Sequence, residues 1–166
     1  MFKPSYYFKG IEDIDVNFFK KENIEGIIID LDNTIIDVQR VISEEKMKWI
    51  GEVIESGVKI CILSNSGNLD KVSSVAKIIG VPYLLNAMKP SKKGFTMALG
   101  ILDLPKEKCA IIGDQVFTDV LGGNRYKMRS ILVDPFDIFE PFWIKVKRPL
   151  ENIIKYKMKY TDAREK

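Results

Sequence analysis

The stretch GIIIDLDNTIID, from Gly26 to Asp37, places two carboxylates at the end of a strongly apolar run. The segment Ile27 to Leu31 does not alternate between apolar and polar residues, which predicts a strand buried on both faces, as in parallel sheets. Carboxylates at the end of a buried strand are costly unless a positive charge compensates them. Asp30 and Asp32 therefore indicate a chemical site where this strand ends.

Apolar runs and helical patterns alternate along the rest of the chain. Further strands are predicted at residues 58–64, 82–86, 108–114 and 130–134, and helices at 15–22, 43–57, 69–80 and 91–102. Buried strands that alternate with helices are typical of a doubly wound, Rossmann-like α/β fold, in which helices cover both faces of a parallel sheet. Because 166 residues are about the length of one domain, we expect a single domain over 1–166.

The apolar spacing within three of these helices predicts which side chains face the sheet. They are Met47, Ile50, Val53 and Ile54 in the helix at 43–57, Leu69, Val72, Ala76 and Ile79 in the helix at 69–80, and Phe95, Ala98, Leu99 and Leu102 in the helix at 91–102. Ser43 is expected to cap the helix at 43–57, and Gly57 and Gly80 are expected to act as stops.

Composition excludes several kinds of chemistry. The chain has no histidine, which removes Ser-His-Asp and Cys-His triads and the usual nitrogen ligands of zinc. Cys61 and Cys109 each lie in an apolar run, which favours buried, reduced thiols over a disulfide or a metal pair. No apolar run approaches the ~18 residues of a membrane span, and no secretory signal is recognisable. We expect a cytoplasmic protein whose proton transfers use carboxylates or lysine.

Polar side chains gather where the predicted strands end or just before the helix at 91–102. They are Asp30, Asp32, Ser64, Asn65, Lys89 and Asp114. In parallel α/β sheets, ligands bind beyond the carboxyl ends of the strands. We therefore expect these residues to form one site.

Four short motifs carry a resemblance to a known family. DLDNT (30–34), LSNS (63–66), MKPSKKG (88–94) and IIGDQVFTDVLGGN (111–124) resemble the ordered motifs of the haloacid dehalogenase (HAD) superfamily of phosphohydrolases. The most similar group is the YqeG-like phosphatases of the capless class III (HAD-IIIA), with distant similarity to phosphatidylglycerophosphatases. The segments between the motifs leave no room for a cap domain, so an open active site is expected.

The resemblance implies Mg²⁺-dependent hydrolysis of a phosphate monoester through an aspartyl phosphate. Asp30 would be the nucleophile, and Asp32 would protonate the leaving oxygen and later activate water. Side chains two residues apart on a strand point the same way, which suits this division of roles. Lys89 would balance charge on the transferring phosphoryl group, and Ser64 and the amide of Asn65 would bind its oxygens.

The metal ligands implied by the resemblance are Asp30, Asp114 and the backbone carbonyl of Asp32. Thr34 would brace the loop, and Asp119 would support the metal site or orient Lys89. Local explanations compete for single residues, because Ser64 is also a candidate helix N-cap and an acid such as Asp119 is common in the first turn of a helix.

The segment 145–166 is the basic part of the chain, with eight Lys or Arg residues and three acidic ones. It predicts either peripheral contact with an anionic membrane or a charged terminal helix. A bulky phosphomonoester would suit an open site, and phosphatidylglycerophosphate is the leading candidate by resemblance. Alternatives are a phosphoprotein or nucleotide phosphatase, or an RNA- or ribosome-associated binding module, so nucleic acid is a further candidate partner. A signalling receiver is disfavoured because it would lack the acid at Asp32.

Overall fold

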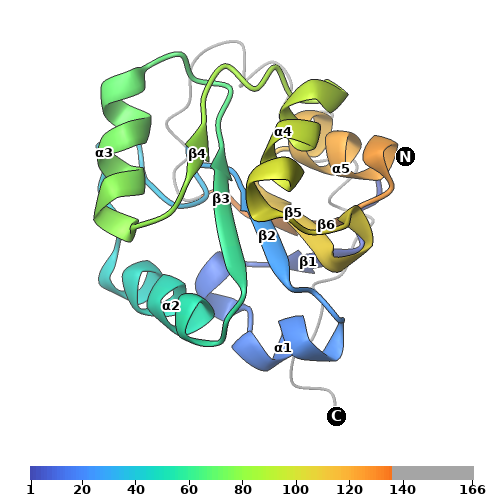
Figure 1. The fold of residues 1–166 in the computed structure, drawn as a ribbon. Helices are drawn as coiled ribbons and strands as arrows, with labels where there is room; N and C mark the ends of the chain where they lie inside the picture. The colour runs from blue at the N-terminus through green and yellow to red at the C-terminus, as the bar shows by residue number, and fades with distance from the viewer. Residues whose placement is uncertain (136–166) are drawn as a thin grey trace.

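The computed structural model describes residues 1–135, which form a six-stranded parallel sheet with the strand order β1-β6-β5-β2-β3-β4 (Figure 1). The strands are β1 (Tyr6–Phe8), β2 (Gly26–Ile29), β3 (Lys59–Leu63), β4 (Tyr83–Leu84), β5 (Cys109–Gly113) and β6 (Arg129–Val133). Every pairing in the sheet is parallel. The central strand β2 lies between β3 and β5, so the motif at its end lies in the middle of the sheet's edge.

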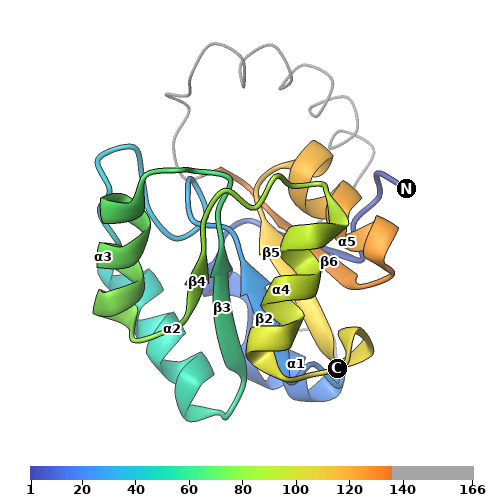
Figure 2. The ribbon, with the colours of Figure 1, turned by 45° about the horizontal axis from the view of Figure 1, so that its top comes forward.

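Helices cover both faces of the sheet, which confirms the predicted doubly wound α/β fold (Figure 2). They are α1 (Val16–Lys21), α2 (Glu44–Glu55), α3 (Leu69–Ile79), α4 (Lys92–Leu102) and α5 (Leu121–Tyr126), the last preceded by a π-helical turn, η3 (Val116–Val120). Within residues 1–135, one helix connects β2 to β3 and one connects β3 to β4, and no cap domain is inserted.

Alternate side chains of β2 belong to two separate cores, as expected for a strand buried on both faces. Ile27 and Ile29 pack with residues of α1, α2 and α3, among them Trp49. Ile28 packs on the opposite face with residues of α4, including Phe95. This burial holds the end of β2, and the carboxylates that follow it, in a fixed position.

The strand β1 was not predicted. Tyr6, Tyr7 and Phe8 pair with Ile131, Leu132 and Val133 of β6 and extend the edge of the sheet. Three residues are too short for a periodic pattern, and their partners lie about 125 positions away along the chain. The extra strand makes the sheet wider but adds no residue to the predicted site.

The prediction that Ile54 and Leu69 face the sheet is wrong, because Ile54 is 42% exposed and Leu69 is 54% exposed. In α2 the predicted Ile50 and Val53 are buried, together with Lys46 and Trp49, which were not predicted. Lys46 can occupy the inner face because its ammonium donates a hydrogen bond of 2.7 Å to the carbonyl of Thr34.

The predicted caps and thiols are confirmed. Ser43 accepts a hydrogen bond from the amide of Lys46, and Gly80 ends α3 in a left-handed conformation with φ of 80°. Cys61 and Cys109 are buried and free. Burial raises the pKa of Cys61 to about 12 and that of Cys109 to about 11, so both thiols stay protonated at neutral pH.

The basic segment 145–166 lies outside the described residues. Among the helices of residues 1–135, none is both long enough and apolar enough to span a bilayer.

Candidate active site

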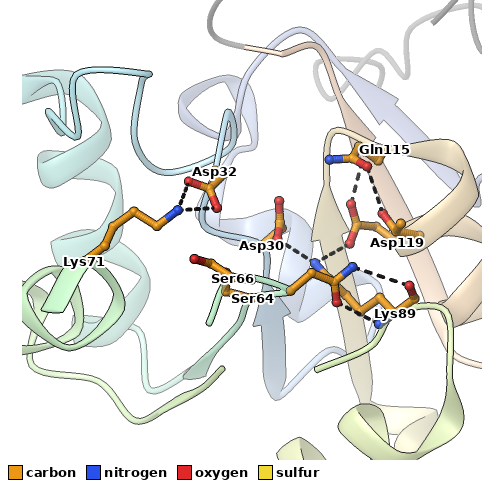
Figure 3. Close-up of polar contacts among 10 residues, drawn as sticks. Asp30, Asp32, Ser64, Ser66, Lys71, Lys89, Gln115 and Asp119 are labelled. Atoms are coloured by element: carbon orange, nitrogen blue, oxygen red, sulfur yellow. Dashed lines mark hydrogen bonds and ion pairs between the residues drawn. The ribbon is translucent and has the colours of Figure 1, made fainter. Parts of the chain in front are cut away.

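The predicted site residues lie together at the carboxyl edge of the sheet, on the loops that follow β2, β3, β4 and β5 (Figure 3). Three of the carboxylates form ion pairs with two lysines. Lys89 contacts Asp30 and Asp119, and Lys71 contacts Asp32.

Lys89, Asp30 and Asp119 form a buried cluster. The ammonium of Lys89 donates hydrogen bonds of 2.5 Å to Oδ1 of Asp30 and 2.7 Å to Oδ1 of Asp119. Side-chain exposure is 2% for Lys89, 7% for Asp30 and 1% for Asp119. Lys89 lies in the loop between β4 and α4, whereas Asp30 follows β2 and Asp119 lies in η3, so three separate segments converge on one ammonium.

Burial and charge act in opposite directions on this cluster. Burial would lower the pKa of Lys89, but the charges of Asp119 and Asp30 raise it above its ordinary value, so the lysine stays charged. Burial raises the pKa of Asp30 well above its ordinary range, and the charges of Asp119 and Asp114 add to this effect, while Lys89 opposes it. Additional positive charge near Asp30 would therefore favour its ionised form.

The same carboxylates could hold a divalent cation. Asp30, Asp114 and Asp119 are all buried, and each brings a possible ligand atom within 4.8 Å of the others. An all-oxygen set suits a hard cation such as Mg²⁺. Such an ion would also offset buried negative charge, which is costly when uncompensated. The donor set therefore fits a divalent metal.

Asp119 is better suited to orienting Lys89 than to binding the ion. Its Oδ1 accepts from Lys89, and its Oδ2 accepts a 3.2 Å hydrogen bond from the amide of Gln115. Both of its oxygens are therefore engaged, which leaves Asp30 and Asp114 as the main carboxylate candidates. The backbone carbonyl of Asp32 stays a predicted ligand.

Asp32 forms the second pair, with Lys71 of α3. Nζ of Lys71 lies 2.7 Å from Oδ1 and 2.9 Å from Oδ2 of Asp32. The Asp32 side chain is 46% exposed and that of Lys71 is 15% exposed, so this pair lies on the solvent side of the site. Lys71 was not predicted as a site residue. A cation in the first turn of a helix, where the dipole disfavours it, was the available signal.

Ser64 and Asn65 connect neighbouring loops. Oγ of the buried Ser64 accepts a 3.0 Å hydrogen bond from the amide of Ser66. It is not the N-cap of α3, because Asn68 occupies that position. The Asn65 side chain accepts a 2.7 Å hydrogen bond from the backbone amide of Lys89. Asn65 thus fixes the loop that carries the lysine, and its role in binding phosphate stays a prediction.

Thr34 lies at the base of the site and is 1% exposed. Its backbone carbonyl accepts the hydrogen bond from Lys46, so bracing of this loop runs through the main chain of Thr34. Lys46 was not predicted as a site residue, although it lies three, four and seven positions before Trp49, Ile50 and Val53, which are all buried. That spacing places it on the inner face of α2.

Comparisons with known proteins agree with this geometry. A family model described as "HAD-hyrolase-like" matches residues 86–135, the part of the chain that contains Lys89, Asp114 and Asp119. The fold and site therefore define a HAD-like hydrolase.

The sequence is 38% identical over 154 residues to "Probable phosphatase YqeG" of Bacillus subtilis (strain 168), covering 92% of this chain and 89% of that protein. The chain belongs to this YqeG-like family of HAD phosphatases. It is also 24% identical to "Phosphatidylglycerophosphate phosphatase 1, chloroplastic" of Chlamydomonas reinhardtii, over 85% of this chain and 56% of that protein. This chain thus spans about half the length of the algal protein.

Among solved structures, the cobalt-bound deoxy-D-mannose-octulosonate 8-phosphate phosphatase of Haemophilus influenzae superposes with a TM-score of 0.54 at 15% identity. The match covers 70% of this chain and 81% of that one, and it supports the fold.

Proposed function

We propose that the protein is a Mg²⁺-dependent phosphomonoesterase that works through an aspartyl phosphate on Asp30. The observation that carries this proposal is the buried cluster in which Lys89 joins Asp30 to Asp119, with Asp114 beside them. A buried charge cluster of this kind is costly to maintain, and at the carboxyl edge of a parallel sheet it is suited to chemistry.

The chain's own groups suit the two half-reactions. Asp30 attacks phosphorus through its second oxygen, Oδ2, since Oδ1 is held by Lys89. The ester P–O bond breaks, and Asp32 gives a proton to the leaving oxygen. Water then attacks the aspartyl phosphate and transfers a proton to Asp32, which releases phosphate and restores Asp30.

Two groups supply positive charge. Lys89 neutralises charge on the phosphoryl oxygens and is held in place by Asp119. A bound Mg²⁺, held by Asp30 and Asp114, would supply electrostatic stabilisation of the phosphoryl group and would favour the ionised form of Asp30. The Asp30 carboxylate is otherwise disfavoured by its burial.

A lipid phosphate, with phosphatidylglycerophosphate as the leading candidate, is the proposed substrate. Loops and helix ends at the carboxyl edge of the sheet carry exposed apolar side chains, namely Val38 (49% exposed), Val41 (53%), Leu69 (54%) and Met88 (73%). Exposed apolar groups beside a phosphate site suit a membrane surface. The 24% identity to the algal phosphatidylglycerophosphate phosphatase supports the same choice. We further propose peripheral action at the cytoplasmic face of a membrane.

Phosphate release with and without Mg²⁺ tests this function. The panel contains an aryl phosphate, sugar phosphates, nucleotide phosphates, a phosphopeptide and phosphatidylglycerophosphate in vesicles, with Asp30→Asn run in parallel. Mg²⁺-dependent release that is fastest from the vesicles and absent in the variant is the expected result. Release from soluble esters alone would reject the lipid substrate, and equal release by the variant would reject Asp30 as nucleophile.

A further inference from the structure

Lys71 lies in the site but has no part in the reaction as proposed above. It comes from the first turn of α3, where its backbone amide donates a 2.9 Å hydrogen bond to the capping side chain of Asn68. Its ammonium contacts both carboxylate oxygens of Asp32, at 2.7 and 2.9 Å. The capped helix end thus fixes the backbone of Lys71 and directs its ammonium to one carboxylate.

The position of Lys71 differs from that of Lys89. Lys89 is 2% exposed and contacts the proposed nucleophile, so it serves the phosphoryl group. Asp32, in its proposed role, must approach the leaving oxygen, and Lys71 lies within hydrogen-bond distance of Asp32. Lys71 therefore lies on the leaving-group side. Because Asp32 is 46% exposed, this is also the side open to solvent, where the rest of a bulky substrate must extend.

Charge makes this position selective. Once Asp32 has given its proton to the leaving oxygen, its carboxylate would repel a leaving group that carries its own negative charge close to that oxygen. An ammonium beside Asp32 offsets that repulsion and offers a flexible cation with three donors to the incoming anion. A neutral leaving group gains nothing comparable from Lys71.

We propose that Lys71 is a specificity-determining residue that binds an anionic group on the leaving part of the substrate. The shared chemistry is a negative charge near the ester oxygen, either a carboxylate or a phosphodiester. This inference rests on the proposed phosphatase function and adds a substrate class to it. Lys71 leaves one carboxylate contact and accepts the substrate anion in its place.

Two pairs of matched esters test the inference in the full-length protein with Mg²⁺. The carboxylate arm compares 2-phosphoglycolate with 2-hydroxyethyl phosphate. The phosphodiester arm compares short-chain, soluble phosphatidylglycerophosphate with glycerol 3-phosphate. In each pair the first ester has an anionic leaving group and the second a neutral one. The readout is the ratio of kcat/KM values within a pair, which cancels any general loss of activity.

Lys71→Met is expected to lower this ratio about tenfold or more in at least one arm, because the charge is removed while the aliphatic stem is kept. Lys71→Arg should retain most of the preference. Lys77→Met removes another lysine of the same helix, one that is exposed, and should match the parent protein. The arm with the larger change identifies the anion.

An unchanged ratio in both arms would overturn the inference. An unchanged ratio that comes with equal losses of kcat/KM on the charged and neutral esters would mean that Lys71 acts only through Asp32. Hydrolysis of the neutral esters by the parent and not by Asp30→Asn tests the phosphatase function separately. If no ester turns over, the proposed phosphatase function fails. Calorimetry would then measure whether the parent binds the anionic ester of each pair more tightly than the neutral one and whether Lys71→Met loses that preference.

Discussion

Asp30 and Asp32 are two residues apart, and each pairs with a lysine, but the two pairs differ in their surroundings. The Asp30 pair is buried, with side-chain exposures of 7% for Asp30 and 2% for Lys89, and a second carboxylate, Asp119, holds the lysine from the other side. The Asp32 pair is 46% and 15% exposed and has one carboxylate. Burial fixes the first pair, whereas solvent leaves the second free to exchange partners.

The different surroundings of the two pairs suit them to different steps of the reaction. A nucleophile and its charge-balancing lysine benefit from fixed geometry in a water-poor site, where electrostatic stabilisation is strongest. A proton-transfer group must reach the leaving oxygen and then water, so access to solvent is useful. The spacing of the DLD motif places one carboxylate in each environment.

Replacing Asp30 or Asp32 is expected to have the largest effects on the rate of phosphate release, and the two effects should depend differently on the ester. Asp30→Asn should lower phosphate release by at least ~10³-fold for every ester, because the nucleophile is removed. Asp32→Asn should lower hydrolysis of alkyl phosphates by about 10²–10⁴-fold and that of aryl phosphates less, because a good leaving group needs less proton transfer. Steady-state assays on both ester types measure this. Equal losses for alkyl and aryl esters in Asp32→Asn would contradict the assigned roles.

Replacing Lys89 should lower the free energy of unfolding more than replacing Lys71. Lys89→Met leaves Asp30 and Asp119 buried without their shared cation, and a loss of about 3–5 kcal/mol in the free energy of unfolding is expected. Lys71→Met breaks a partly exposed pair and should cost about 1 kcal/mol or less. Urea denaturation of both variants beside the parent measures the difference. Similar losses for the two variants would remove the basis of the comparison.

A divalent cation should act on the buried cluster. Mg²⁺ at about 100 times its dissociation constant is expected to stabilise the parent by ~2.7 kcal/mol, because it binds the folded state. Asp114→Asn should lose most of this gain, and Asp32→Asn should keep it, since only the backbone carbonyl of Asp32 is a predicted ligand. Thermal unfolding with Mg²⁺ and with EDTA gives the readout, and a full gain in Asp114→Asn would argue against this metal site.

The pH dependence of stability should report the burial of Asp30. The pKa of Asp30 is raised in the folded state by burial, so the folded protein holds this proton to higher pH than the unfolded chain does. Its contribution to stability is therefore fully present below the ordinary pKa of 3.8 and is lost as pH rises through the folded-state pKa. With EDTA present, the parent should lose up to ~1.4 kcal/mol per pH unit relative to Asp30→Asn between the ordinary pKa of 3.8 and the folded-state pKa of Asp30, and the two curves should run parallel above the folded-state pKa.

Urea midpoints between pH 4 and pH 8 provide this measurement. Asp30→Asn should give a flatter curve than the parent. Parallel curves for the two proteins would mean that burial does not hold a proton on Asp30.

Much of this arrangement was predictable from the sequence because it depends on local patterns. The apolar run before Asp30 predicted a buried strand, and polar residues after successive strands predicted a shared edge, where the structure places them. The catalytic and metal-binding roles of these residues stay predictions. The sequence predicted two possible roles for Asp119, support of the metal site or orientation of Lys89. Its contact with Lys89 favours the second role.

The features that were missed depend on contacts between distant segments. Lys71 was missed because its partner, Asp32, lies 39 positions earlier in the chain, and the place of this lysine in the first turn of a helix does not identify that partner. Lys46 was missed because charged residues are rarely buried unless they are paired, and its partner is a backbone carbonyl. Tertiary geometry decides which lysines find such partners.

Chemical trapping of the intermediate tests whether Asp30 is the nucleophile. Protein quenched in acid during turnover of an aryl phosphate with Mg²⁺ would be treated with borohydride, which reduces an aspartyl phosphate to homoserine, and then digested for mass spectrometry. We expect homoserine at position 30, in the peptide that carries DLDNT, and none at Asp32, Asp114 or Asp119. Homoserine at another aspartate, or steady turnover with no reduced residue, would contradict it.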